Sequence, residues 1–272
     1  MALDLSALRA KLGELKGNTA RTEVLWKPKE GENRIRIVPL AITPDNPFTE
    51  LYFHYLGNKT YLSPISFGDA DPIAEFADSL RAGGGLSKED WKETKKFVPQ
   101  RRTYVPVIDR NNPEAGVRFW AFGKTVYSDL LAVMADPDFG DITDAQTGRD
   151  IKVTFVPQEK SDTSFAKTTI IVSPKQTILT SDAVQLKKWL NEQPDLMALY
   201  PKMSYDDLKD VLEKFVNGGT SATPSTRTVT NKTDDNWGDD VSPSAAKARN
   251  VTKKPSADIE AQFADAFGSS TK

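Results

Sequence analysis

Short runs of residues that alternate between apolar and polar side chains constrain the fold of this chain most. The alternation is clearest where Ile35 and Ile37 are interleaved with Arg34 and Arg36. Because successive side chains of a strand point to opposite faces, such runs are typical of half-buried antiparallel strands. They predict a mainly β fold, with an antiparallel barrel and a sandwich as the two alternatives. The runs are Asn33–Val38, Glu50–Leu56, Lys59–Leu62, Thr103–Ile108, Val117–Phe122, Ile151–Val156 and Thr168–Val172.

Helices are expected both as inserts between these strands and after the last strand, which makes the class α+β. A Ser or Asp side chain just before a helix accepts hydrogen bonds from the N–H groups of the first turn. Ser181 or Asp182 is therefore expected to begin one C-terminal helix, and Ser204 to begin the other. The expected helices are Pro72–Arg81, Ser87–Lys96, Thr125–Ala135, Ala183–Asn191 and Tyr205–Asn217.

The two ends of the chain differ in composition from its middle. Residues 1–16 show leucines at helical spacing, which predicts a short N-terminal helix that must pack on its own core or on a neighbouring molecule. Residues 218–272 are rich in Ser, Thr, Pro and Asn and contain few large apolar side chains, so we predict a disordered tail. The expected organisation is an arm over residues 1–20, a core over residues 21–217 and a tail over residues 218–272.

Large apolar side chains recur at regular spacing at the tip of the tail. Ile259, Phe263 and Phe267 lie four residues apart and are flanked by acidic residues. This spacing favours a short helix that docks in the groove of a partner protein. The alternative is a frayed chain end in which the spacing has no function.

The residue types that are missing exclude several kinds of chemistry. The 272 residues include no Cys and a single His, His54. Without Cys there is no disulfide and no thiolate nucleophile or metal ligand, and one His cannot form a structural zinc site, so we expect no metal and no other cofactor. Neither a Gly-rich phosphate loop nor a nucleophile-elbow pattern is present. We therefore expect a binding protein rather than an enzyme, with His54 in a structural or surface role.

The sequence also argues against a membrane protein. It contains no apolar run of about 18 residues, the length that crosses a bilayer as a helix. Its N-terminus lacks the basic region followed by an apolar stretch that a secretory signal needs. We expect neither a membrane-spanning segment nor secretion.

The segment Lys95–Lys124 interleaves cations with aromatic rings, a pattern typical of surfaces that bind single-stranded nucleic acid. The formal net charge is -2, but residues 88–102 carry six basic side chains against three acidic ones. In the second strand run of this segment, alternation places Arg118, Trp120 and Phe122 on one face. We interpret that face as a wet surface that meets a ligand. The alternative is a strand buried on both faces, with Arg118 reaching solvent at its rim.

Four stretches resemble, in the same order, parts of the helix-destabilising single-stranded DNA-binding protein family of T-even-type phages. GENRIRIVPL resembles the first core strand, and NPFTELYFHYLGNKTYL resembles the segment that holds the zinc-binding His of the family. QRRTYVPVIDRNNPEAGVRFWAFGKTVYSDLLAVM resembles its basic motif, aromatic strand and following helix, and IKVTFVPQEKSDTSFAKTTI resembles its last hairpin. The resemblance covers residues 27–179. It implies an OB-fold antiparallel barrel with a helical insert, a self-association arm and a partner-binding tail.

The resemblance further implies sequence-tolerant binding of single-stranded DNA in phage DNA replication, recombination and repair. Trp120 and Phe165 match the positions at which the family stacks bases. Arg101, Arg102 and Tyr104 match its cationic rim. Together with the cations of the basic segment, the expected DNA-binding residues are Lys95, Lys96, Arg101, Arg102, Tyr104, Arg118, Trp120, Lys124, Phe165 and Lys167.

The chain departs from the family pattern in three places. The family binds zinc through one His and three Cys, whereas the corresponding segment SPISFGDADPIAEF contains no Cys. The tail has balanced charge rather than a strongly acidic composition. The arm, LDLSALRAKLGELK, lacks the basic Lys-Arg-Lys-Ser-Thr motif of the family, and the residues expected to mediate self-association are Leu5, Leu8, Arg9, Lys11 and Leu12.

The expected partners are single-stranded DNA, further copies of the chain along the DNA, and phage replication and recombination proteins bound through the tail. The expected location is the cytoplasm of the infected host cell. Two alternatives remain open. One is an RNA-binding OB protein, and the other is a phage structural or adaptor protein whose tail is a tether.

Overall fold

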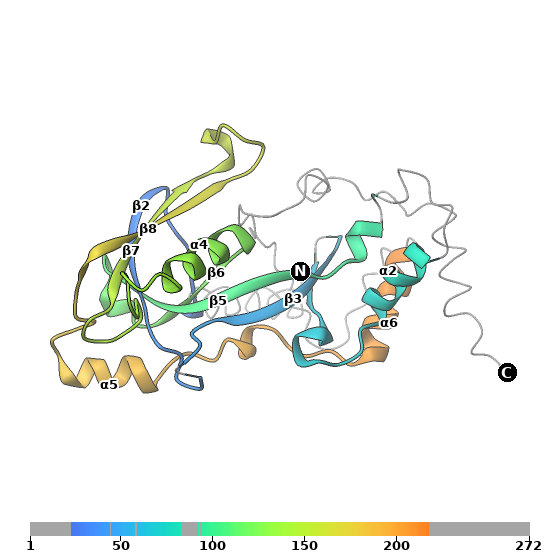
Figure 1. Ribbon diagram of the computed structural model, residues 1–272. Coiled ribbons are helices and arrows are strands. Elements are labelled where there is room, and N and C mark those ends of the chain that lie inside the picture. Colours follow the sequence, from blue (N-terminus) through green and yellow to red (C-terminus); the bar gives the residue numbers. More distant parts are fainter. Residues whose placement is uncertain (1–22, 44, 58, 83–91, 93, 218–272) are drawn as a thin grey trace, which may run out of the picture. The chain divides into compact units, whose positions relative to one another are not determined.

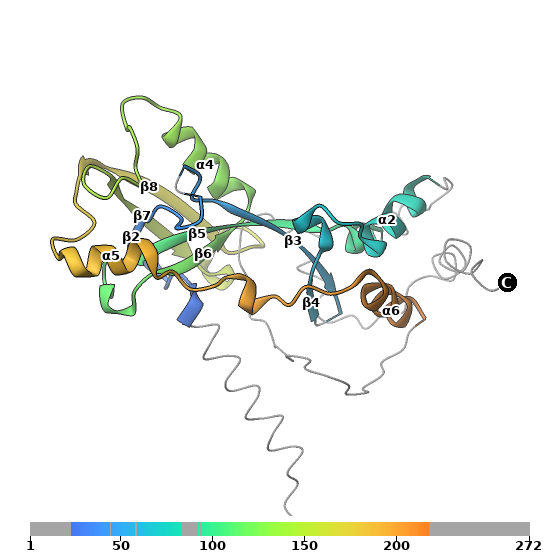
Figure 2. The same ribbon diagram turned by 90° about the horizontal axis from the view of Figure 1, so that it is seen from below.

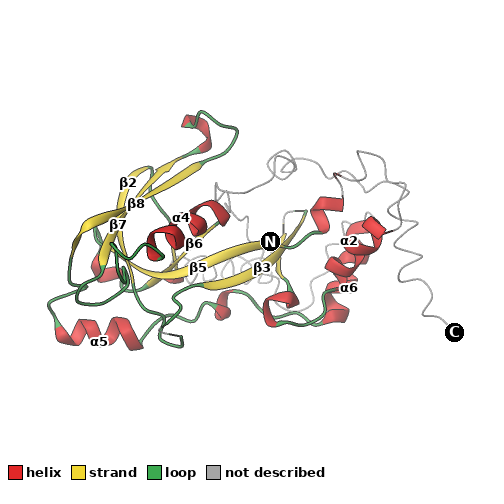
Figure 3. Ribbon diagram, in the orientation of Figure 1, coloured by secondary structure: helices red, strands yellow, loops and turns green. Residues whose placement is uncertain are grey.

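The computed structural model describes residues 23–43, 45–57, 59–82, 92 and 94–217 (Figure 1). In this part of the chain, eight strands combine with helices and short 3₁₀ turns (Figure 3). The expected mixture of a multi-stranded sheet and helices is confirmed. The described residues divide into two compact units, one from residues 23–50 and 102–199 and one from residues 51–101 and 200–217.

The first unit is built on six strands, which are hydrogen-bonded in the order β1-β6-β5-β2-β7-β8. β1 pairs with β6 in parallel, and the other neighbours pair antiparallel. Among the described residues this sheet is open, with β1 and β8 at the ends of the order, so the expected closure into a barrel is not confirmed. The strands are β1 (Leu25–Trp26), β2 (Gly31–Ile37), β5 (Gln100–Asp109), β6 (Arg118–Phe122), β7 (Arg149–Val156) and β8 (Lys167–Gln176).

Two helices cover this sheet, and Figure 2 shows them on opposite sides of the strands. α4 (Lys124–Met134) packs Val126 and Leu130 into the main core. α5 (Ala183–Asn191) buries Trp189 against a second cluster that includes Ile108. The expected cap of α5 is confirmed, since the side chain of Asp182 accepts hydrogen bonds from its first turn.

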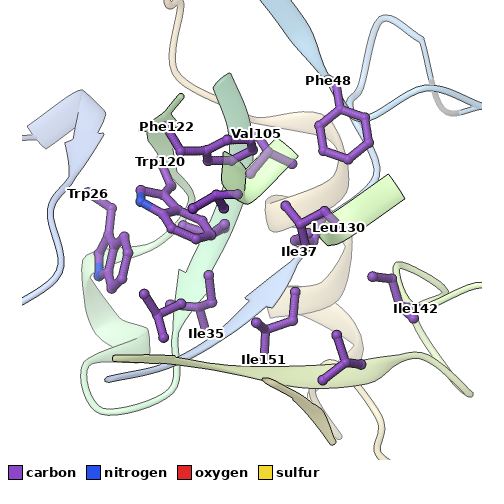
Figure 4. Packing of buried hydrophobic residues seen from close by; sticks show 14 residues of the cluster. Trp26, Ile35, Ile37, Phe48, Val105, Trp120, Phe122, Leu130, Ile142 and Ile151 are labelled. Carbon is purple, nitrogen blue, oxygen red and sulfur yellow. The ribbon is translucent and has the colours of Figure 1, made fainter. Parts of the chain in front are cut away.

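The main core of the first unit lies between the sheet and α4 (Figure 4). Each inner strand contributes alternate residues to it, as the period of two requires. The buried residues are Trp26, Ile35, Ile37, Phe48, Val105, Val107, Trp120, Phe122, Val126, Leu130, Ile142, Ile151, Val153 and Val172.

The second unit consists of a hairpin and two helices. β3 (Thr49–Leu56) pairs antiparallel with β4 (Lys59–Leu62), with Phe53 opposite Leu62. α2 (Pro72–Ala82) and α6 (Tyr205–Val216) bury a shared apolar cluster around Phe76, Phe97 and Leu212. Ser204 caps α6 as expected, by accepting a hydrogen bond from Asp207 N–H. Short 3₁₀ turns occur at Pro64–Phe67, Lys95–Phe97, Pro113–Ala115, Gln158–Lys160 and Met197–Leu199.

Candidate nucleic-acid interface

The first of the predicted DNA-binding residues lie in the second unit. Lys95 is exposed and Lys96 is half-buried, both in the 3₁₀ turn Lys95–Phe97, while Phe97 anchors this turn in the apolar cluster. Arg101, at the start of β5, is also exposed. The turn is thus fixed by its one aromatic residue, and its charged groups are left at the surface.

The next two predicted residues lie in the first unit and are buried. Arg102 keeps 6% of its surface exposed and Tyr104 keeps 3%. A phenol ring this deeply covered presents no face on which a base could stack. The prediction that Tyr104 lies on an open rim is therefore wrong for this structure, because both faces of β5 are covered.

The same correction applies to Trp120, which was expected on a wet face with Arg118. Only 1% of Trp120 is exposed, and Phe122 is buried beside it (Figure 4). The indole meets the ring of Trp26 edge-on at 5.6 Å between centroids and that of Phe122 at 4.7 Å. Because the opposite face of β6 is buried as well, through Phe119, the strand fits the alternative of burial on both sides.

Arg118 lies at the rim of this core. Its Nη2 is 3.8 Å from Asp109 Oδ2, the oxygen that accepts a hydrogen bond from Trp26 Nε1 at 3.1 Å. Burial lowers the pKa of Arg118 and the charge of Asp109 raises it, and the net result is a pKa below the ordinary value. Arg118 Nε is buried and has no hydrogen-bond partner among the described residues. The guanidinium is therefore tied to the core rim rather than presented to a ligand.

Lys124 is exposed at the first position of α4. The residue before it, Gly123, has no side chain that could cap the helix, and no side-chain capping bond is formed there. The backbone N–H groups of a helix N-terminus carry partial positive charge. A cation and an uncapped helix start thus coincide at the end of β6.

Phe165 and Lys167 lie where the β7–β8 hairpin turns back, in the projecting part of the hairpin in Figure 1. Phe165 is half-buried and Lys167 is exposed. The hydroxyl of Thr163 donates to the carbonyl oxygen of Phe165 at 2.9 Å, which fixes the backbone there. Of the two aromatic residues expected to stack on bases, Phe165 alone keeps part of its surface exposed.

Sequence reasoning missed a buried ionic network on β2. Arg36 is fully buried, with Nη1 at 3.2 Å from Asp150 Oδ1 and Nη2 donating to the carbonyl oxygen of Thr177 at 2.6 Å. Arg110 shares the same carboxylate, at 2.9 Å, and donates to the carbonyl oxygen of Leu179. Burial lowers the pKa of Arg36, which Asp150 raises in part, so the net shift is downward. Since its acceptors Asp150 and Thr177 lie 114 and 141 residues away in the sequence, no local pattern marks Arg36 as internal.

His54 is buried in the second unit and has a structural role. Its Nε2 lies 2.8 Å from Asp71 Oδ2, and the hydroxyl of Ser63 donates to the same oxygen. The other oxygen of Asp71 accepts the N–H groups of Ile73 and Ala74, which caps α2. Activation of a serine nucleophile requires a Ser–His hydrogen bond. Here the Asp71 carboxylate lies between the side chains of Ser63 and His54, so these three residues fix the start of α2.

Two groups of predicted residues lie outside the described part of the chain. They are the self-association residues Leu5, Leu8, Arg9, Lys11 and Leu12 and the partner-binding residues Ile259, Phe263 and Phe267. Within the described residues, no group of three or more His, Cys, Asp or Glu is placed to hold a metal ion. No helix among those residues has the length and apolar character that crossing a bilayer requires.

Comparison of the sequence with protein-family models finds no match, and comparison with curated proteins finds none either.

Proposed function

We propose that this chain binds single-stranded DNA without reading its sequence, through phosphate neutralisation by Lys and Arg and through stacking on a partly exposed ring. The observation that carries this proposal concerns Lys95, Lys124 and Lys167. All three are exposed, and in the described part of the chain their ammonium groups have no ion-pair or hydrogen-bond partner. Cations that are not neutralised within the protein are available to phosphates.

An OB-type barrel is the finer description that we propose for the first unit. In the order β6-β5-β2-β7-β8, the first of the five strands lies between the second and the fourth. The helix α4 connects the third strand to the fourth. The OB-fold is a partly open five-stranded barrel that binds oligonucleotides, so this order and the resemblance to the phage family support the same fold.

The start of α4 supports phosphate binding at Lys124. Backbone N–H groups and the helix dipole favour an anion at such a position. The Lys124 ammonium adds a full positive charge beside the uncapped first turn. We propose that this end of α4 contacts the DNA backbone rather than a base.

The proposal extends to the ends of the chain. The arm would mediate contacts between copies along the DNA. The apolar tip of the tail would bind replication and recombination proteins of a phage, in the cytoplasm of the infected host cell.

A titration of a fluorescently labelled oligo(dT) with the full chain tests the proposal through anisotropy. We expect binding that weakens with salt, prefers single strands to the matched duplex, and is competed more strongly by DNA than by RNA of the same sequence. Replacement of Lys95, Lys124 and Lys167 by Ala should make the salt dependence shallower, by about 0.7 in log–log slope for each phosphate that is no longer neutralised. Replacement of Lys187 and Lys188 by Ala, both exposed on α5, is the matched control. No binding by the intact chain at low salt would refute the function.

A further inference from the structure

The outer face of strands β2, β7 and β8 carries a strip of exposed and half-buried side chains. Lys167 is the one residue of this strip that is among the predicted binding residues. The strand register places Arg34 opposite Lys152, and Lys152 opposite Ile171. The next row of the same face contains Glu32, Thr154 and Thr169. We call this set, together with Lys167 at the start of β8, the outer strip: Arg34, Glu32, Lys152, Thr154, Lys167, Thr169 and Ile171.

The strip begins where the cover of this face ends. Arg36 points to the same face as Arg34, because the two are separated by one residue on β2. Arg36 is covered and bonded to Asp150 and Thr177, whereas Arg34 is exposed. The guanidinium of Arg34 has no hydrogen-bond or ion-pair partner among the described residues. On the same face of β2, the buried and ion-paired Arg36 thus lies two residues from Arg34, which is exposed and unpaired within the described part of the chain.

The charges of the strip favour an anion. Arg34, Lys152 and Lys167 are positive, and Glu32 is the one acidic side chain in these rows. Lys152 pairs with Glu32 at 2.8 Å, but Glu32 is 67% exposed, and an exposed pair of this kind contributes little. Lys152 is therefore able to exchange this carboxylate for a phosphate at small cost.

The apolar member of the strip suits a nucleic acid. Ile171 is 59% exposed in the middle of β8, between hydroxyl-bearing and cationic neighbours. From Ile171 to Lys167 the strand runs for roughly 13 Å, four residues at about 3.3 Å each. Beyond Lys167 the chain reaches Phe165, the predicted stacking residue that remains partly accessible. Cationic, apolar and partly exposed aromatic side chains therefore follow one another along β8 and the turn before it.

We propose that the backbone of single-stranded DNA lies along the outer strip, with phosphates at Arg34, Lys152 and Lys167 and with sugars or bases against Ile171 and Phe165. This inference rests on the proposed function and adds the outer strip to the phosphate contacts proposed there. The β5–β6 face, which the sequence pointed to, has its aromatic residues in the core.

The test compares the full chain with the double variant Arg34→Ala, Lys152→Ala. For each neutralised phosphate, the binding constant falls with salt concentration raised to a power of about 0.7. At about 0.1 M salt, removing one phosphate-binding side chain should therefore weaken binding about fivefold. The double variant should therefore bind labelled oligo(dT) about 25-fold more weakly, with a log–log salt slope shallower by about 1.4. The variant Arg34→Lys, Lys152→Arg should retain most of the affinity, and Lys187→Ala on α5 should bind like the wild type.

The possible results separate this inference from the function itself. If the intact chain binds oligo(dT) and the double variant binds equally well with the same slope, the strip is not the DNA path, while the proposed function stands. If the intact chain does not bind, both are refuted. Because the replaced side chains are exposed or half-exposed, the melting temperature of the double variant should match the wild type. A weaker affinity together with a lowered melting temperature and no change in salt slope would contradict the strip.

Discussion

Replacement of Trp120 by Ala decides whether this indole belongs to the core or to a DNA interface. Its side chain is 1% exposed and contacts two rings edge-on, those of Trp26 and Phe122. Truncation of a buried Trp to Ala costs ~3–5 kcal/mol of unfolding free energy, from the burial that is removed and from the cavity that remains. Each aromatic pair adds about 0.5–1.5 kcal/mol. We therefore expect a decrease of about 5 kcal/mol, a large share of the ~5–15 kcal/mol that stabilises a typical domain.

Urea unfolding followed by far-ultraviolet circular dichroism measures this decrease. The Trp120→Ala variant should unfold at a much lower urea concentration than the wild type. Trp120→Phe is the matched control, because it keeps a ring between the same neighbours and should be destabilised less. An oligo(dT) titration of the protein that remains folded should show near-normal affinity, because the indole is not expected to touch DNA.

The opposite pattern would refute the assignment to the core. If Trp120→Ala unfolds at the wild-type urea concentration and binds oligo(dT) tenfold or more weakly, the indole contacts DNA. Base stacking on an aromatic ring is worth ~1–3 kcal/mol, so a weakening of that size would be measurable.

Three further perturbations test other parts of the structure. Gly148→Ala should destabilise the chain by about 3 kcal/mol in a urea titration, because a Cβ there would lie 2.4 Å from the carbonyl oxygen of Asp144 and 2.7 Å from Arg36 Nη2; wild-type stability would show that this packing relaxes freely. Burial raises the pKa of Asp71, but its bonds to His54, Ser63 and Ala74 N–H outweigh this and lower the pKa below the ordinary value. The ionised form of Asp71 thus stabilises the fold above the unfolded-state pKa of about 3.9, and this contribution is lost as pH falls through the lower folded-state pKa. Asp71→Asn should lower the free energy of unfolding by about 1–3 kcal/mol at neutral pH and should remove this part of the dependence of stability on acid pH. An unchanged dependence of stability on acid pH would contradict this reasoning. Treatment with a chelator should leave melting temperature and oligo(dT) affinity unchanged, whereas one zinc ion per purified chain would overturn the expectation.

Much of the secondary structure could be predicted from local patterns. The helix Ala183–Asn191 and the strand Lys59–Leu62 have the expected bounds, and the other expected strands lie within a few residues of theirs, whereas β1 (Leu25–Trp26) was not expected. Alternation and capping act over a few residues, so they are readable from the sequence. The expected helix Ser87–Lys96 lies mostly outside the described residues, and its last two residues begin a 3₁₀ turn.

The faces of the strands were less predictable than the strands themselves. β6 has apolar side chains on both faces, Phe119 on one and Trp120 on the other, so alternation alone could not say which face meets water. The answer depends on residues that are distant in the sequence, such as Trp26 on β1, whose ring meets the indole of Trp120 edge-on. A strand with one polar residue among five is better interpreted as buried on both sides.

The arginines of β2 and its neighbours show how the fold divides cations between structure and surface. Asp150 forms ion pairs with both Arg36 and Arg110. The carbonyl oxygen of Thr177 accepts a further hydrogen bond from Arg36, and that of Leu179 accepts one from Arg110. A guanidinium held by such fixed acceptors has no free charge to offer a phosphate. Arg34, one row further along, has none of these acceptors among the described residues. The formal net charge of -2 therefore says little about nucleic-acid binding, because acidic residues such as Asp150 neutralise interior cations. Under the proposed function, the cations that decide binding are those that remain available at the surface, such as Arg34, Lys152 and Lys167 of the outer strip.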